Sequence, residues 1–327
     1  MTDERKSEIG KLFLLSNKIS IEKLEKLEIQ EIIFLIVSAN YFKENKTFEK
    51  GNISKKIELF LSVLNHKIRH SEELYIAYDK NTLYPFMDPS GYIWMFSKAE
   101  YADNIKKYLD QQQILVYVKR LSGEEVLKEF ADMHRLGLKK ILMDNGQYIT
   151  EINRDDILPS YDWKDTPKIN IPIENPKLQN AMILYFQNLY SKNNYEGKDE
   201  ICHQLEDKII EEILNAKYLV PIKIDGENSS VTDDETTIPL KKDTIIHFGC
   251  VVNEDNTQYL SAFTDWVEFE KAFDKNVWKS SISSYKDLLT FSEKMQGIVI
   301  NCRGTSFCIG EENKKKFEEY RKEKKYQ

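Results

Sequence analysis

The sequence predicts an α+β fold made of two tandem copies of one small domain. Two stretches, 91–150 and 258–309, carry the same series of features about 160 residues apart. In each stretch an apolar strand ends in Phe followed by Ser or Thr, two helices follow, and a glycine precedes a short strand that opens a hairpin. Solenoid repeats have periods of about 20 to 50 residues, so this much longer spacing indicates a duplicated domain.

Hydroxyl residues mark the expected helix starts in both copies, because a Ser or Thr side chain can accept a hydrogen bond from a free amide of the first turn. A Glu three residues later completes a capping box. The expected capping residues are Thr264 and Ser283 or Ser284 in the later copy, and Ser97 with Glu100 and Ser122 with Glu125 in the earlier copy.

Glycines mark the expected helix ends. Gly137 and Gly297 each follow a helical run and precede a short strand, where a left-handed residue costs glycine no steric strain. In the later copy we expect a hairpin of 298–301 with 307–309. In the earlier copy a turn around 144–146 connects the corresponding strands.

Helical segments precede each sheet. Residues 1–70 have apolar side chains at helical spacing, and the corresponding part of the later copy runs from 176 to 216. Between the copies, four prolines within 159–176 remove backbone donors and favour extended chain. We therefore expect an N-terminal domain over 1–160, a linker over 161–175 and a C-terminal domain over 176–327.

At these residues the chain resembles the SseB-like family, which is named for enhanced serine sensitivity. The resemblance rests on the Phe-Ser or Phe-Thr step, the late Gly before an apolar strand, a helix that begins Asn-Pro-Lys-Leu and a strand that ends in Pro. The residues that carry it are 96–97 and 263–264, 297–301, 175–178 and 218–221. It covers most of the second half and, less closely, about 74–158 of the first half.

The resemblance implies a cytoplasmic bacterial α+β protein with a poorly defined molecular role. Its motifs mark a fold and carry no chemistry. Such sequences often have Asn-Pro after the late strand, whereas this chain has Asn301-Cys302.

Composition limits the classes of partner. The chain has 327 residues, 41% of them hydrophobic, and a net charge of -7, which gives no general attraction to nucleic acid or to an anionic membrane. Apolar runs fall far short of the roughly 18 residues that span a bilayer. The four cysteines are too few and too scattered for a disulfide framework. We expect a cytoplasmic protein that is a monomer or a homodimer.

A metal site is not expected from the Cys and His residues. Cys202 and His203 diverge on a predicted helix, and His247 and Cys250 point to opposite faces of a predicted strand over 245–252. Zinc needs four converging ligands, so we interpret these cysteines as ordinary buried thiols.

An enzyme is not expected either. Cys302 and Cys308 flank the hairpin turn, and no second histidine lies nearby in sequence to activate them. The chain has no Gly-rich phosphate loop, Gly-x-Ser-x-Gly elbow or His-Glu-x-x-His motif. We therefore expect no cofactor and no catalytic residue.

Two charged segments are interpreted as surface features. The polar insertion 225–242 predicts an exposed loop, with regulation or partner binding as the alternative. Lysines and glutamates are interleaved over 311–327, which predicts a solvated helix rather than a nucleic-acid patch.

The candidate partner-binding residues are Asp265 and Trp266, at a predicted helix start. Tryptophan is enriched at interface hot spots, and a helix start is often half-exposed. We expect a non-enzymatic adaptor that binds another protein or a peptide through the second copy. Two alternatives stay open: an immunity or inhibitor protein against a basic toxin, and a small-molecule-binding or enzymatic module with a pocket between the copies.

Overall fold

The computed structural model describes residues 1–45, 50–167, 170–224 and 245–325. By contacts the chain divides into two compact units. Unit 1 comprises 1–134, 138–160 and 187–196, and unit 2 comprises 135–137, 161–186 and 197–327. The domain limits expected from the sequence stay a prediction. Two short segments depart from the order of the chain: 135–137 group with unit 2, although the residues on either side belong to unit 1, and 187–196 group with unit 1, although the residues on either side belong to unit 2.

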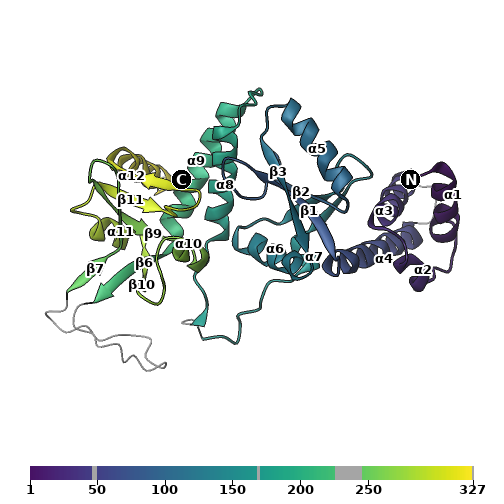
Figure 1. Ribbon diagram of the computed structural model, residues 1–327, viewed down its shortest axis with the longest axis horizontal. Coiled ribbons are helices and arrows are strands. Elements are labelled where there is room, and N and C mark those ends of the chain that lie inside the picture. The colour runs from purple at the N-terminus through teal and green to yellow at the C-terminus, as the bar shows by residue number, and fades with distance from the viewer. Residues whose placement is uncertain (46–49, 168–169, 225–244, 326–327) are drawn as a thin grey trace. The chain divides into compact units, whose positions relative to one another are not determined.

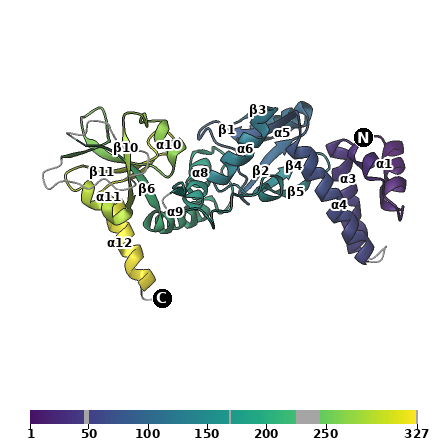
Figure 2. The same cartoon turned by 90° about the horizontal axis from the view of Figure 1, so that it is seen from below.

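Unit 1 begins with helices and continues into a sheet of five strands. Helices α3 and α4 lie side by side ahead of the sheet (Figures 1 and 2). The helical elements are α1 (Asp3–Ile9), the π-helical turn η1 (Gly10–Leu14), α2 (Ile21–Glu25), α3 (Ile29–Glu44), α4 (Lys50–Arg69), α5 (Ala99–Gln111), α6 (Glu124–Arg135) and α7 (Arg154–Ile157). The strands are β1 (Glu73–Asp79), β2 (Tyr92–Phe96), β3 (Val116–Ser122), β4 (Lys140–Met143) and β5 (Thr150–Asn153). The helical interpretation of 1–70 is confirmed for the described residues.

Unit 2 repeats this plan with its own helices and strands, and α12 runs on from its last strand (Figure 2). Its helices are α8 (Pro176–Tyr190), whose residues from 187 onward group with unit 1, α9 (Lys198–Asn215), α10 (Trp266–Glu270), α11 (Tyr285–Phe291) and α12 (Glu311–Lys325). Its strands are β6 (Lys217–Ile224), β7 (Ile246–Phe248), β8 (Cys250–Val252), β9 (Gln258–Ala262), β10 (Lys279–Ser284), β11 (Gly297–Ile300) and β12 (Phe307–Ile309). The predicted C-terminal helix is confirmed over the described residues 311–325.

Strand order shows the duplication directly. In unit 1 the order is β3-β1-β2-β4-β5, with only β2 and β4 parallel. In unit 2 β10 pairs with β6, and a bridge from Leu219 to Phe263 joins β6 to the end of β9. Strand β9 then runs parallel to β11, and β11 pairs antiparallel with β12. The path β10-β6-β9-β11-β12 therefore repeats the strand order and the relative strand directions of β3-β1-β2-β4-β5 in unit 1. The predicted α+β class is confirmed.

Each unit has its own apolar core. In unit 1 Phe86, Trp94 and Phe96 pack with Leu109 of α5 and Val116 of β3. In unit 2 a larger cluster joins α8, α9, α11 and α12 to β6, β9 and β11. Alternating strand residues and one face of each helix supply these side chains, as expected for helices that cover a sheet.

Several expected caps differ from those observed. Ser284 caps α11 in a capping box with Asp287, as predicted. Thr264 does not cap α10; the N-cap is the next residue, Asp265, whose carboxylate accepts from the Glu268 amide. Ser97 does not cap α5 either, because its hydroxyl donates to Asp144 at 2.7 Å. Glu125 accepts from both the amide and the hydroxyl of Ser122, which forms one half of the predicted box.

The two late glycines serve different purposes. Gly137 has φ +69°, which confirms the left-handed helix end. Gly297 has no positive φ, so that prediction was wrong. A Cβ at Gly297 would lie 2.4 Å from the carbonyl oxygen of Ile309, and close approach of β11 to the chain at the end of β12 is therefore what requires glycine there.

The predicted strand over 245–252 was wrong in its continuity. Gly249 interrupts it, and β7 pairs with β6 whereas β8 pairs with β9. A Cβ at Gly249 would lie 2.7 Å from atoms of Pro221 and Phe273, so the chain changes sheets where only glycine fits. The insertion 225–242 lies outside the described residues. Among the described residues, no helix combines the length and the apolar character that a bilayer crossing requires.

Candidate functional site

The candidate site is built around the start of α10, where the chain leaves β9. Asp265 is the N-cap, and its Oδ1 accepts a hydrogen bond from the Glu268 amide at 3.0 Å. The carboxylate also lies at the positive end of the helix dipole, which favours its negative charge. Capping of this kind contributes about 1 kcal/mol to a helix, and it fixes the direction in which the next residue, Trp266, projects.

A buried polar cluster supports this turn from below. The Thr264 hydroxyl donates to Asp265 Oδ2 at 3.0 Å and accepts from Gln179 Nε2 at 2.7 Å and from Asn301 Nδ2 at 2.9 Å. Asn301 Oδ1 in turn accepts from the Thr264 amide at 3.1 Å. The cluster joins α8, the end of β9 and the end of β11, so the site lies where the two parallel strands of unit 2 finish.

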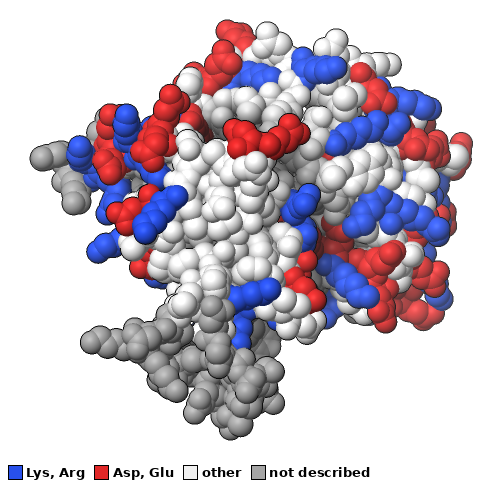
Figure 3. Space-filling model, turned by 60° about the vertical axis from the view of Figure 1, so that its left-hand side comes forward, with Lys and Arg blue, Asp and Glu red and all other residues white. Residues whose placement is uncertain are grey.

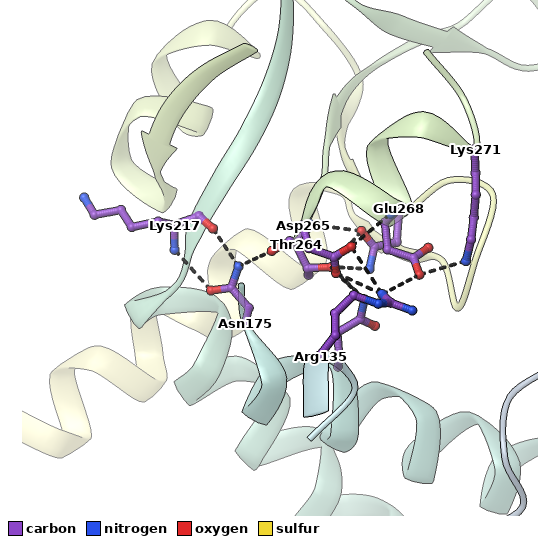
Figure 4. Close-up of polar contacts among 9 residues, drawn as sticks. Arg135, Asn175, Lys217, Thr264, Asp265, Glu268 and Lys271 are labelled. Atoms are coloured by element: carbon purple, nitrogen blue, oxygen red, sulfur yellow. Dashed lines mark hydrogen bonds and ion pairs between the residues drawn. The ribbon is translucent and has the colours of Figure 1, made fainter. Parts of the chain in front are cut away.

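The Asn175 side chain forms hydrogen bonds with both this turn and Lys217, the first residue of β6. Its Nδ2 donates to the carbonyl oxygens of Thr264 and Lys217, each at 2.7 Å, and its Oδ1 accepts from the Lys217 amide at 3.3 Å (Figure 4). One side chain therefore satisfies three backbone groups from two segments. This explains in physical terms the Asn-Pro that begins α8: Asn bridges the strands and Pro starts the helix.

A compact ion cluster completes the site (Figure 4). Arg135 Nη1 lies 3.2 and 3.1 Å from the two oxygens of Asp265 and 3.1 Å from Glu268 Oε1, and Lys271 Nζ donates to the same Glu268 oxygen at 2.8 Å. Arg135, Asp265 and Glu268 are all buried. Burying charges is costly unless they are paired; Arg135 pairs with both carboxylates, and Lys271 adds a second contact to Glu268.

Trp266 is the exposed element that this network supports. It is 37% exposed, and its ring packs edge-on against Phe269 with centroids 5.0 Å apart. Phe269 itself is buried and contacts Phe263 and Phe273. Val267, 48% exposed, lies beside it on the same short helix. The indole therefore packs against an aromatic cluster while the residue as a whole remains more than a third exposed.

Charge on the visible surface is mixed. Figure 3 shows lysine, arginine, aspartate and glutamate side chains interspersed around the margin of the side that faces the viewer, with mainly uncharged side chains at its centre. No single sign dominates this face.

Most polar groups of the site pair with one another, although Gln179 Oε1 is buried without a hydrogen-bond partner among the described residues. Carboxylates face a guanidinium and an ammonium, and the hydroxyl is engaged by two amides. Among the described residues, no group of three or more His, Cys, Asp and Glu side chains is placed to hold a metal ion. What this arrangement can do is hold a helix start rigidly and present its first residues.

Of the four cysteines, Cys302 packs against the Phe263 and Phe269 cluster of this site. Cys202 and Cys250, which were interpreted as buried thiols, are partly buried, as is Cys302, whereas Cys308 is exposed. Burial raises the pKa of the Cys202, Cys250 and Cys302 thiols above the usual value, which favours the unreactive protonated form. His247 and Cys250 do not share one strand as predicted, because they lie in β7 and β8, which belong to different sheets.

The two candidate residues take different positions. Asp265 is only 2% exposed and acts within the fold, whereas Trp266 faces solvent. Their role in partner binding stays a prediction. Sequence reasoning missed Arg135, Glu268, Gln179 and the role of Asn301. Arg135 is 130 residues from Asp265 in the sequence, so no local sequence pattern predicts that the two side chains pair.

Together, fold and site define an α+β domain in which a buried polar network positions the start of a short helix. Residues 202–309 match the family model described as the SseB protein N-terminal domain. The predicted resemblance to the SseB-like family is thus confirmed over this segment. The match begins within α9, ends at β12 and lies within one copy. Comparisons with curated proteins and with solved structures returned no match.

Proposed function

We propose that this chain is a non-enzymatic, cytosolic protein-binding or adaptor protein that recognises another protein or a peptide through α10. The observation that carries the proposal is the exposure of Trp266 on a rigid support. Tryptophan side chains bury large areas and are enriched among the few residues that dominate binding energy.

The supporting network lowers the cost of binding. An interface side chain that is ordered only on association loses about 0.5 to 1.5 kcal/mol of conformational free energy. Here Trp266 is already packed against Phe269, and Asp265 fixes the backbone that carries it. This support favours Trp266 and its neighbour Val267 as anchors, with Asp265 as the residue that positions them.

Charge favours a basic partner. The net charge of -7 attracts positively charged surfaces and speeds their encounter. The same charge disfavours nucleic acid, whose phosphates repel it. A partner with a basic rim around an apolar pocket for the indole fits both features.

The test is affinity capture of the tagged full chain from a native lysate of the source cells, followed by measurement of the dissociation constant for each recovered partner. Trp266→Ala and Val267→Asp are the test variants. Tyr108→Ala is the matched control, since Tyr108 is a 53% exposed aromatic residue on α5, the helix of unit 1 that corresponds to α10.

We expect a stoichiometric partner whose affinity falls about 30-fold or more in Trp266→Ala, the loss typical of a hot spot, and is unchanged in Tyr108→Ala. One partner with nanomolar affinity would specify an inhibitor or immunity role, and several weaker partners an adaptor. Equal recovery with Trp266→Ala and Val267→Asp would refute α10 as the binding face, and absence of any partner would refute the proposed function.

A further inference from the structure

Unit 1 contains a cavity of about 310 Å³ that the site on α10 does not use. It lies beyond the end of β1, and the residues that precede β3 and the segment 187–195 also line it. Phe86, Met87, Ile114 and Leu115 supply apolar walls. A volume near 300 Å³ with apolar walls and a few polar groups is typical of small-molecule sites.

The most distinctive polar group in this cavity is the carboxylate of Asp79. The residue is 4% exposed, although it is the last residue of a strand. Its Oδ1 accepts three hydrogen bonds, from the Asn81 amide at 3.0 Å and from the Thr82 amide and hydroxyl at 2.7 and 2.8 Å. Its Oδ2 accepts no hydrogen bond from the described residues. A carboxylate has acceptor capacity at both oxygens. Oδ2 is not among the buried atoms that lack a partner, so it is accessible from the cavity and can still accept a hydrogen bond.

The walls around Asp79 are held in place. The Gln187 side chain accepts from the Met87 amide at 2.9 Å and donates to the Pro85 carbonyl oxygen at 2.9 Å and to the Thr82 hydroxyl at 3.3 Å. These bonds fix the loop that follows β1 against the segment that begins at 187. Tyr190, which is half-exposed, lies at the rim and adds an aromatic face. The cavity is therefore formed before any ligand arrives.

We propose that this cavity binds a small organic cation, a protonated amine on an apolar or aromatic body, with the ammonium on Asp79 Oδ2 and the body against Phe86 and Leu115. The ammonium supplies the donor that the unpartnered oxygen lacks. The aromatic rings nearby also favour a cation through their π faces. The proposal uses residues of unit 1 and is independent of the binding role assigned to α10.

The chemistry disfavours the other ligand classes. An anion would meet a buried negative group, and a carboxylate cannot donate to it. A neutral alcohol could donate one hydrogen bond but would leave the charge uncompensated. Burial raises the pKa of Asp79, opposed by hydrogen bonds from Thr82 and Asn81, so a cation at this carboxylate would favour its ionised form. Lys192, the basic residue of the lining, is exposed and forms no ion pair with Asp79.

Three ligands of similar shape separate these classes: 2-phenylethylamine, 2-phenylethanol and 3-phenylpropanoate. Calorimetric titration of each into the full chain at neutral pH measures affinity, and NMR locates binding through the Asn81 and Thr82 amides. We expect the amine to bind at least about tenfold more tightly than the alcohol or the acid, equivalent to about 1.4 kcal/mol. Equal affinities, or no saturable binding of the amine at low-millimolar concentration, would overturn the proposal.

Asp79→Asn is the matched variant, because an asparagine Oδ1 can keep all three hydrogen bonds of the turn while the charge is removed. We expect it to lose at least about tenfold in amine affinity and to keep the melting temperature within a few degrees. Asp88→Asn is the control. Asp88 also accepts three hydrogen bonds, from Ser90, Tyr92 and Trp94, but lies outside the lining. Unchanged amine affinity in Asp79→Asn, or an equal loss in Asp88→Asn, would refute the role of Asp79. The ligand comparison on the unsubstituted chain stands whether or not the variants fold.

Discussion

Asp144 and Asn301 occupy the same position in the two copies and share a left-handed backbone. Their φ angles are 57° and 53°, unusual for residues other than glycine. Each follows the second strand of the parallel pair, β4 or β11. The Asp144 amide donates to the Met95 carbonyl at 2.8 Å, and the Asn301 amide donates to the Ala262 carbonyl at 2.9 Å.

The side chains repeat the same contacts. Asp144 Oδ1 accepts from the Ser97 amide at 2.6 Å, as Asn301 Oδ1 accepts from the Thr264 amide. A glutamine from a preceding helix completes each cluster: Gln30 donates to Asp144 at 2.9 Å, and Gln179 donates to Thr264. The recurring Phe-Ser or Phe-Thr step thus marks a junction that Asp or Asn closes from the neighbouring strand.

Replacing Asn301 should destabilise unit 2. Asn301→Ala removes the acceptor of the buried Thr264 amide and leaves a Cβ residue at positive φ. We expect the free energy of unfolding to fall by about 2 to 4 kcal/mol in urea denaturation. Asn301→Gly loses the same hydrogen bonds without the backbone strain, so it should be about 1 kcal/mol more stable than the alanine variant. An alanine variant as stable as the original would contradict this account of the junction.

Arg135 should contribute far more than Lys271 to the free energy of unfolding, although both side chains contact Glu268. Arg135→Met leaves the buried Asp265 carboxylate without its cation, and we expect a loss of about 3 to 5 kcal/mol in the free energy of unfolding. Lys271 is partly exposed, so Lys271→Met should cost about 1 kcal/mol or less. Chemical denaturation followed by circular dichroism measures both. Equal losses in the two variants would show that burial of the guanidinium does not determine how much each cation contributes to the free energy of unfolding.

Gly137 should tolerate no side chain. A Cβ there would lie 2.2 Å from the Pro176 carbonyl oxygen, and φ is +69°. We expect Gly137→Ala to cost at least about 3 kcal/mol, because the substitution forces the backbone to move and also strains it. Gly123 has φ +53°, but a Cβ there would have nothing within 4 Å, so Gly123→Ala isolates the conformational part, about 1 to 2 kcal/mol. Thermal unfolding of both variants provides the comparison, and a Gly137→Ala cost no larger than that of Gly123→Ala would exclude the steric explanation.

The pKa values of two aspartates, Asp144 and Asp287, should be shifted in opposite directions from the ordinary value. Burial raises the pKa of Asp144, only partly opposed by hydrogen bonds from Ser97 and Gln30. Between the ordinary and the raised value the folded state binds the proton more tightly, so this group makes the free energy of unfolding fall as pH rises. Hydrogen bonds from Ser284 lower the pKa of Asp287, whose contribution to stability is present above the ordinary value and is lost as pH falls through the lowered one.

Carboxyl ¹³C NMR titration of the full chain measures both pKa values directly. Asp144→Asn and Asp287→Asn assign the signals and remove the respective slopes from the stability profile. An Asp144 pKa at or below that of Asp287 would contradict the dominance of burial at the junction.

Much of the fold could be predicted because its signals are local. Helical periodicity, the Asn-Pro helix start at 175–176 and the Phe-Thr step all lie within a few residues of the structure they specify. The duplication was visible for the same reason, since both copies carry these signals in the same order.

Long-range features could not be predicted. Nothing near Ser97 in sequence shows that Asp144 competes for its hydroxyl, which is why the expected cap failed. The requirement for glycine at 249 and 297 arises from Pro221, Phe273 and Ile309, and it appears only when the strands are packed. Arg135 and the cavity oxygen of Asp79 belong to the same class: their surroundings come from distant parts of the chain.

The pairing of Ile224 with Ile246 brings a practical consequence. These residues face each other at the ends of β6 and β7, and β7 lies at the end of its sheet, so the chain departs and returns at adjacent points. Extending a connection between closed ends costs little, about 0.6 kcal/mol for each doubling of its length. A fluorescent reporter or an epitope could be spliced between these two residues without shifting any strand register, which gives this protein a built-in position for labelling.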